Sequence, residues 1–223
     1  MNFYGHAVLA AEDRQHPEFV LGAMLPDLAG MAGLRLPDLQ SAELRAGVAH
    51  HHRVDAAFHT APQFVELVSA ALSDLCARGV ARGPSRAVAH VGVELLLDGW
   101  LSSSTSLRSV PYHEALRTVA DCIELQQVGH RATLVRLSER LQQAPIPQAY
   151  GDPQFVADRL AYMLQDRKRL RLQPNDLPSA VAILKNIQNS LETNAASLLA
   201  HVRKGLLRTP TSESRDNSAA EHR

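Results

Sequence analysis

Apolar residues recur along most of the chain with the spacing of amphipathic α-helices. Residues 62–78, PQFVELVSAALSDLCAR, carry an apolar side chain at nearly every third and fourth position, which places one apolar stripe along a helix. The stripe consists of Phe64, Leu67, Val68, Ala71, Leu72, Leu75 and Cys76. Residues 85–101, SRAVAHVGVELLLDGWL, are apolar on almost every side and predict a central, buried helix with Ser85 as its N-cap.

The pattern continues in the second half of the chain. Residues 111–143 predict one long helix, or two helices joined near Gly129, and the loop APIPQAYGDP follows at 144–153. Asp152 and Pro153 have the residue types of an N-cap and a first-turn proline, so the next helix should begin there.

A final long helix is expected from about Pro178 to Gly205. Strand patterns are nearly absent, so the sequence predicts an all-α fold, a single-domain helical bundle. We place this domain at residues 1–207. Residues 209–223, TPTSESRDNSAAEHR, are polar and aperiodic, and we expect residues 208–223 to form a disordered tail.

Composition and charge narrow the function. The 223 residues are 45% hydrophobic and 21% charged, which suits one domain with a sizeable core. Lys+Arg and Asp+Glu both number 23, so the molecule as a whole offers no strong field for nucleic acid. No apolar run reaches the ~18 residues of a membrane span. We therefore expect no nucleic-acid partner and no membrane span; the sequence does not indicate an oligomeric state.

The cysteines and the first residues bear on the compartment. Cys76 and Cys122 both fall within apolar helical patterns, so we expect small core residues in a reducing compartment rather than a disulfide. The opening MNFYGHAVLAAEDRQ lacks a basic signal-peptide region. Together these features favour a cytoplasmic protein.

The chain concentrates imidazoles in residues 47–62, GVAHHHRVDAAFHTAP. His51, Asp55 and His59 are spaced four apart, so on a helix all three point to one side, as a metal site or a solvated face would require. Adjacent helical positions point about 100° apart, so His50, His51 and His52 cannot all serve one centre. At least one of them should be exposed.

A second polar series, His90, Glu94 and Asp98, recurs every four residues in the helix expected to be buried. A buried charge costs several kcal/mol unless it is paired, protonated or bound to metal. The carboxylates either face solvent or pair with an arginine such as Arg53, or Asp98 turns into a polar site within the bundle. Helical bundles build metal sites from such inward side chains.

Two further candidates stand alone in apolar sequence. His6 lies in MNFYGHAVLAA, and a single histidine there is ordinarily a core residue. Asp27 follows Pro26 in FVLGAMLPDLAG, where an aspartate is ordinarily a helix cap or turn residue.

Taken in order, MNFYGH, GAMLPD, GVAHHHRVD and LLLDGWL resemble the successive motifs of the acyl carrier protein phosphodiesterases, bacterial helical hydrolases related to the HD phosphohydrolase superfamily. The segment YGDPQFVADRLAYMLQDRKRLRL is also similar to that family, so the resemblance extends to about Leu207. GAMLPD by itself also resembles zinc-dependent phospholipase C-type proteins.

The resemblance implies a set of site residues. The positions that match the family's metal ligands are His6, Asp27, His51 and Asp98. Asp55 matches the acid of the histidine-arginine motif and Arg53 its arginine. Three departures stand out: His52 replaces a second arginine, His59 replaces an aspartate, and Leu97-Asp98-Gly99 replaces a Trp-Asp-His pattern.

The implied reaction is hydrolysis of the phosphodiester that joins a 4′-phosphopantetheine arm to a serine of acyl carrier protein. Mixed imidazole and carboxylate ligands suit a divalent cation, with Mn²⁺ as our first expectation and Fe²⁺, Zn²⁺ or Mg²⁺ as alternatives. Arg53 would clamp a phosphate oxygen. Asp55 or His52 would orient the water or act as general base.

An acidic carrier protein needs a basic docking face. The basic residues in question are Arg167, Lys168, Arg169 and Arg171, with His201, Arg203 and Lys204 near the end of the last helix. Docking, and simple stabilisation of helix ends by cations, both remain open. Two other functions also remain: hydrolysis of another phosphoester (a small molecule, a nucleotide or a phospholipid head group), and a non-catalytic helical metal-binding module.

Overall fold

The computed structural model describes residues 1–36, 38–103, 112–122, 128–145 and 147–208, and these residues form helices joined by turns, with no strand among them. The predicted all-α fold is confirmed. In chain order the helices are α1 (Phe3–Asp13), α2 (Pro17–Met31), α3 (Ala42–His59), α4 (Pro62–Ala77), α5 (Arg82–Ser103), α6 (Tyr112–Arg117), α7 (Val119–Cys122), α8 (Val128–Gln143), α9 (Pro153–Leu164) and α10 (Leu177–Arg208), with short 3-10 turns η2 (Gln148–Gly151) and η3 (Pro174–Asp176).

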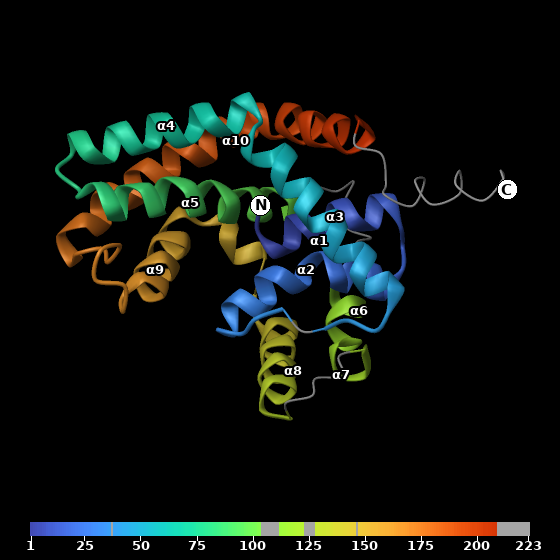
Figure 1. Ribbon diagram of the computed structural model, residues 1–223. Coiled ribbons are helices and arrows are strands. Elements are labelled where there is room, and N and C mark those ends of the chain that lie inside the picture. Colours follow the sequence, from blue (N-terminus) through green and yellow to red (C-terminus); the bar gives the residue numbers. More distant parts are fainter. Residues whose placement is uncertain (37, 104–111, 123–127, 146, 209–223) are drawn as a thin grey trace, which may run out of the picture.

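The helices surround one apolar core in two connected groups. Helices α4, α5 and α10 lie side by side, and α10 also contacts α9 and α3 (Figure 1). Helices α1, α2 and α3 pack on one another, and α1 reaches α5 (Figure 1). The N-terminal part of the chain therefore lies against the middle of the molecule, where α1, α2, α3 and α5 meet.

Helices α2 and α3 cross at a pair of glycines. A Cβ added to Gly47 would overlap the carbonyl oxygen of Phe19 and lie 2.8 Å from the amide nitrogen of Ala23. A Cβ added to Gly22 would overlap the carbonyl oxygen of Leu44. The two backbones therefore approach as closely as only glycine allows, which fixes the relative position of the helices.

Several predicted boundaries hold, and others are wrong. Asp152 caps α9, because its Oδ1 accepts a hydrogen bond from the amide of Gln154 at 2.9 Å. Ser85 is not an N-cap: α5 already begins at Arg82, and the Ser85 hydroxyl donates to the carbonyl of Val80 at 3.1 Å.

The stretch predicted as one or two helices over 111–143 is divided further. Helix α6 ends at Arg117 and a new helix, α7, begins at Val119. Residue 111 and residues 123–127, between α7 and α8, lie outside the described residues. The expected loop at 144–153 contains the 3-10 turn η2. The last helix extends to Arg208, while residues 209–223 of the expected tail lie outside the described residues. The division into a domain and a disordered tail stays a prediction.

The cysteines differ from expectation in one respect. Both are free thiols, but Cys76 is exposed rather than in the core. The buried line of α4 passes through Phe64, Ala71 and Leu75, and Cys76 lies one position beyond it.

None of the helices in the described part of the chain combines the length and apolar character needed to cross a membrane.

Candidate metal centre

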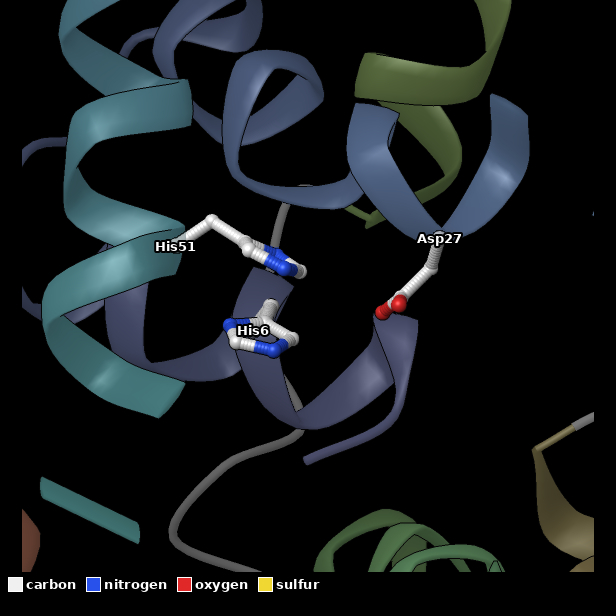
Figure 2. Close-up of side chains that lie close together, drawn as sticks. All are labelled: His6, Asp27 and His51. Carbon is white, nitrogen blue, oxygen red and sulfur yellow. The ribbon is translucent and has the colours of Figure 1, made fainter. Parts of the chain in front are cut away.

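Three polar side chains from three helices converge in the interior (Figure 2). His6 of α1, Asp27 of α2 and His51 of α3 each offer a ligand atom, and these atoms all lie within 4.8 Å of one another. The His6 and His51 rings are stacked, with centroids 3.8 Å apart. The structure thus brings together three of the four residues expected to bind metal.

The glycine crossing orients His51. His51 follows Gly47 by about one helical turn, and Asp27 follows Ala23 by the same spacing, so both lie just beyond the point where α2 and α3 touch. The His51 Nδ1–H donates to the carbonyl of Ala23 over 2.9 Å. This bond assigns the ring proton to Nδ1 and leaves the lone pair of Nε2 free to bind a cation, as in many metal-ligating histidines.

His6 is also oriented by hydrogen bonds, but through its Nε2 rather than its Nδ1. Its side chain is fully buried, and Nε2 lies 3.1 Å from Asp55 Oδ1 and 3.1 Å from the carbonyl oxygen of Met1. Both partners are acceptors, so Nε2 carries the proton. Nδ1 is then an acceptor, and it is buried without a hydrogen-bond partner among the described residues.

Asp27 is a half-buried residue in the second half of α2. The helix continues through Pro26, so Asp27 is neither a cap nor a turn residue. Its Oδ2 is buried and has no hydrogen-bond partner in the described part of the chain. Burial raises the pKa of Asp27 to about 8. Buried polar atoms ordinarily have a partner, so the unpartnered atoms of His6 and Asp27 fit a bound cation.

The imidazoles are held in the form that binds metal. Burial lowers the pKa of His6 to about 3, and burial also lowers the pKa of His51. Both rings are therefore neutral near pH 7, and metal ligation requires neutral imidazole.

Asp55 connects the two histidines. Its Oδ1 accepts hydrogen bonds from His6 and, at 2.9 Å, from the N-terminal ammonium of Met1, and its Oδ2 lies 3.5 Å from His51 Nε2. Burial acts to raise the pKa of Asp55, but the hydrogen bond from His6 and the Met1 ammonium hold that pKa below its ordinary value. Asp55 is therefore an ionised carboxylate that orients the His6 imidazole and lies beside His51.

Asp98 lies outside this group of ligand atoms. It is fully buried and accepts hydrogen bonds from Asn2 Nδ2 at 2.7 Å, the Gly5 amide at 2.8 Å and the Tyr4 amide at 3.3 Å. Burial raises the pKa of Asp98 to about 7, against the effect of these donors. Asp98 thus turns inward rather than toward solvent, and it fixes the turn of α1 that carries His6.

The neighbouring Gly99 explains one departure from the family pattern. A Cβ at this position would lie 2.6 Å from the carbonyl oxygen of Tyr150 and would also overlap the backbone of Gly151. Helix α5 and η2 pack too closely here for a histidine side chain.

The other two residues expected to be catalytic are less enclosed. His52 is exposed, in agreement with the expectation for at least one of the three consecutive histidines. Arg53 is half-buried, and its Nε is a buried atom without a partner among the described residues. His50, by contrast, is buried against Phe19, with ring centroids 5.3 Å apart.

Sequence reasoning missed one grouping. His59, His90 and Glu94 form a second set whose ligand atoms lie within 4.8 Å of one another. The i, i+4 spacing of His90 and Glu94 was visible in the sequence, but their contact with the end of α3 was not.

The model of the acyl carrier protein phosphodiesterase family matches residues 1–202. The chain belongs to this family. No match was found among the curated proteins or the solved structures. The three converging side chains, His6, Asp27 and His51, lie within the residues that match this acyl carrier protein phosphodiesterase family, as do Asp55 and Asp98.

Proposed function

We propose that this chain hydrolyses the phosphodiester between the 4′-phosphopantetheine arm and the serine of holo-acyl carrier protein, with a divalent cation held by His6, Asp27 and His51. Family membership supports the reaction. The observation that supports a bound metal is the convergence of these three ligand atoms within 4.8 Å. In addition, His6 and Asp27 each have a buried atom with no hydrogen-bond partner in the described chain.

When bound, such a cation polarises a phosphate oxygen and lowers the pKa of a water molecule. Two imidazole nitrogens and a carboxylate suit Mn²⁺, Fe²⁺ or Zn²⁺, and Mn²⁺ is our first choice. Asp98 is a fourth candidate ligand. Its three hydrogen bonds support a positioning role, in which it holds Asn2, Tyr4 and Gly5 and thereby His6.

The remaining residues act on the substrate and on the ligands. Asp55 accepts a hydrogen bond from His6 Nε2, so it keeps the lone pair of His6 Nδ1 available to the cation. Arg53 supplies a guanidinium for a phosphate oxygen, a role supported by its unpartnered Nε in the described chain. His52 is exposed, so its imidazole is accessible to substrate and solvent, and it is the candidate general base.

Docking of the acidic carrier protein is assigned to the basic turn after α9. Arg167, Lys168, Arg169 and Arg171 are all exposed there, between α9 and η3. Arg203 is less available, because it forms a bidentate ion pair with Glu12 at 2.7 and 2.8 Å. The turn follows the C-terminus of α9, so its cations also suit the helix dipole.

Two further features complete the proposal. The histidine and aspartate ligands on helices are consistent with a relationship to the HD phosphohydrolases. A cytoplasmic location is supported by the two free cysteines, since a reducing compartment keeps thiols reduced.

The test compares wild type with Asp27→Ala in release of phosphopantetheine from holo-acyl carrier protein in the presence of Mn²⁺. We expect the variant to lose about 100-fold or more in kcat/KM, because loss of a ligand should cost at least what loss of its supporting partners does. Asp74→Ala, on the exposed face of α4, is the matched control. Equal activity of Asp27→Ala and wild type would contradict the metal site.

The same assay separates the substrate classes. Small phosphodiesters, nucleotides and phospholipids are offered in parallel with the carrier protein. Turnover restricted to holo-acyl carrier protein supports the proposal, whereas faster turnover of a small phosphoester would reassign the substrate.

A further inference from the structure

A second set of ligand-type side chains lies where the end of α3 meets the middle of α5. His59 is the last residue of α3, and His90 and Glu94 are one turn apart on α5. Glu94 Oε1 lies 3.2 Å from His59 Nε2 and 3.3 Å from His90 Nε2. The same nitrogen of both rings is therefore directed at one carboxylate.

These separations match those between two ligands of one cation. Ligands about 2.0–2.2 Å from a metal ion, at tetrahedral or octahedral angles, are roughly 3–3.5 Å apart. Two histidines and one glutamate also form a ligand set used by zinc enzymes, in which a further coordination position stays open. Divalent transition-metal ions are thus the class of ligand that fits.

The imidazoles are held in place by packing rather than left mobile. The two rings stack with centroids 5.1 Å apart and an interplanar angle of 22°. Phe64 contacts both rings edge-on, at 5.2 Å from His59 and 5.2 Å from His90. A ligand pair fixed in this way needs little reordering when a cation arrives.

The set is open to solvent. The side chains of His59 and His90 are 34% and 41% exposed, and that of Glu94 is 14% exposed. The two histidines line a surface hollow of about 360 Å³ beside Phe64, Val65 and Val68. A cation can therefore enter from outside and keep a coordination position facing the hollow.

Glu94 is an ionised ligand. Burial acts to raise the pKa of Glu94, but the hydrogen bonds from His59 and His90 and the Met1 ammonium hold that pKa below its ordinary value. The ammonium lies 3.3 Å from Oε1, so a cation and the ammonium would share the negative charge of this carboxylate.

We propose that His59, His90 and Glu94 form a second divalent transition-metal site, distinct from the site of His6, Asp27 and His51. The proposal does not depend on hydrolysis of a phosphodiester, because it concerns direct binding of the metal. The competing explanation is a hydrogen-bonded cluster that binds no metal.

The experiment is a Co²⁺ titration of the metal-free full-length chain, followed by calorimetry and by the visible absorption of bound Co²⁺. Wild type should bind two ions per chain. His90→Ala and Glu94→Gln should each bind one, with the affinity of the lost site reduced by about 100-fold or more. Asp27→Ala should also bind one, and the absorption band that it retains should be the band that His90→Ala loses.

His201→Ala is the matched control, since His201 is an exposed histidine on α10, and it should bind two ions. Far-UV circular dichroism verifies that the variants fold, and the exposure of His90 makes its truncation the milder change. A single ion per wild-type chain that His90→Ala and Glu94→Gln retain and Asp27→Ala loses would overturn the proposal, whereas a single ion lost only in His90→Ala and Glu94→Gln would support it and contradict the first site. Two ions in both His90→Ala and Glu94→Gln would overturn it as well.

Discussion

Asp27 illustrates how a single half-buried carboxyl group can couple the site to pH. Its pKa is raised from 3.8 to about 8 by burial, so the folded protein retains a proton that the unfolded chain releases between these two values. That contribution to stability is fully present below about pH 4, and it is lost as the pH rises toward 8. A bound cation would replace the proton.

The first prediction therefore concerns Asp27→Asn in the metal-free protein. Asparagine keeps the shape but does not ionise, so the variant should gain stability relative to wild type as the pH rises from 5 to 7.5. The gain should approach about 1.4 kcal/mol per pH unit. Urea unfolding in the presence of a chelator measures it, and a difference independent of pH would show that Asp27 is not a buried protonated acid.

Asp98 gives a second prediction at this scale. Its two oxygens accept three N–H groups, whereas an asparagine side chain would turn its NH₂ group toward at least one of these donors. Asp98→Asn should therefore cost roughly 1–3 kcal/mol of unfolding free energy at pH 8. Asp74→Asn, at an exposed position of α4, should change stability by less than about 0.5 kcal/mol. If both variants unfold at the same urea concentration, Asp98 does not anchor the N-terminal turn.

Among the elements, the crossing of α2 and α3 determines where two of the three ligands lie. Gly22 and Gly47 bring the two backbones into contact, and His51 bonds the backbone of α2 one turn later. Any change that separates the helices moves His51 away from Asp27. The geometry of the site is thus a consequence of helix packing.

Gly47→Ala tests this dependence. The added methyl group would overlap the Phe19 carbonyl, so we expect a loss of about 1–3 kcal/mol and weaker Mn²⁺ binding. Gly30→Ala is the matched control in α2, because a Cβ there meets nothing within 4 Å among the described residues. It should raise stability by about 0.5–1 kcal/mol through helix propensity. Calorimetric unfolding and Mn²⁺ titration measure both effects, and unchanged Mn²⁺ affinity in Gly47→Ala would disprove the link.

Periodicity predicted the elements better than their contacts. The stripe beginning at Phe64 located α4, because burial of one helix face leaves a regular pattern in the sequence. The start of α5 was misplaced, because a serine in the first turn of a helix can bond the preceding backbone as readily as it caps. The local sequence indicates clearly where a helix lies, but it indicates less clearly the residues at which the helix begins and ends.

For the molecule as a whole, the spacing of residues along the chain could not predict which residues far apart in the sequence lie together in the fold. His6 and Asp27 each looked like an ordinary core or turn residue, and the approach of His51 to Asp27 depends on a glycine contact between α2 and α3. The order of the motifs along the chain resembles that of a known family, and this resemblance identified the candidate metal ligands that periodicity could not identify. His59 and Glu94 had no such guide, so their contact emerged only from the structure.

The exposed basic turn after α9 gives a prediction about how the whole molecule binds its substrate. If the exposed basic turn docks an acidic carrier protein, kcat/KM on that substrate should fall as salt increases from 50 to 500 mM, because exposed charges are screened over about 10 Å or less. Arg169→Ala combined with Arg171→Ala should raise KM several-fold and leave kcat unchanged. Lys185→Ala, an exposed cation on α10, is the control. Salt-insensitive turnover would move the docking surface elsewhere.

The central claim is that His6, Asp27 and His51 hold one cation. Anomalous diffraction at the manganese edge, from crystals of the active protein grown with Mn²⁺, tests it most directly. We predict a peak about 2.0–2.3 Å from His51 Nε2, His6 Nδ1 and an Asp27 oxygen. An active protein whose anomalous map shows no peak among these three side chains would contradict the account.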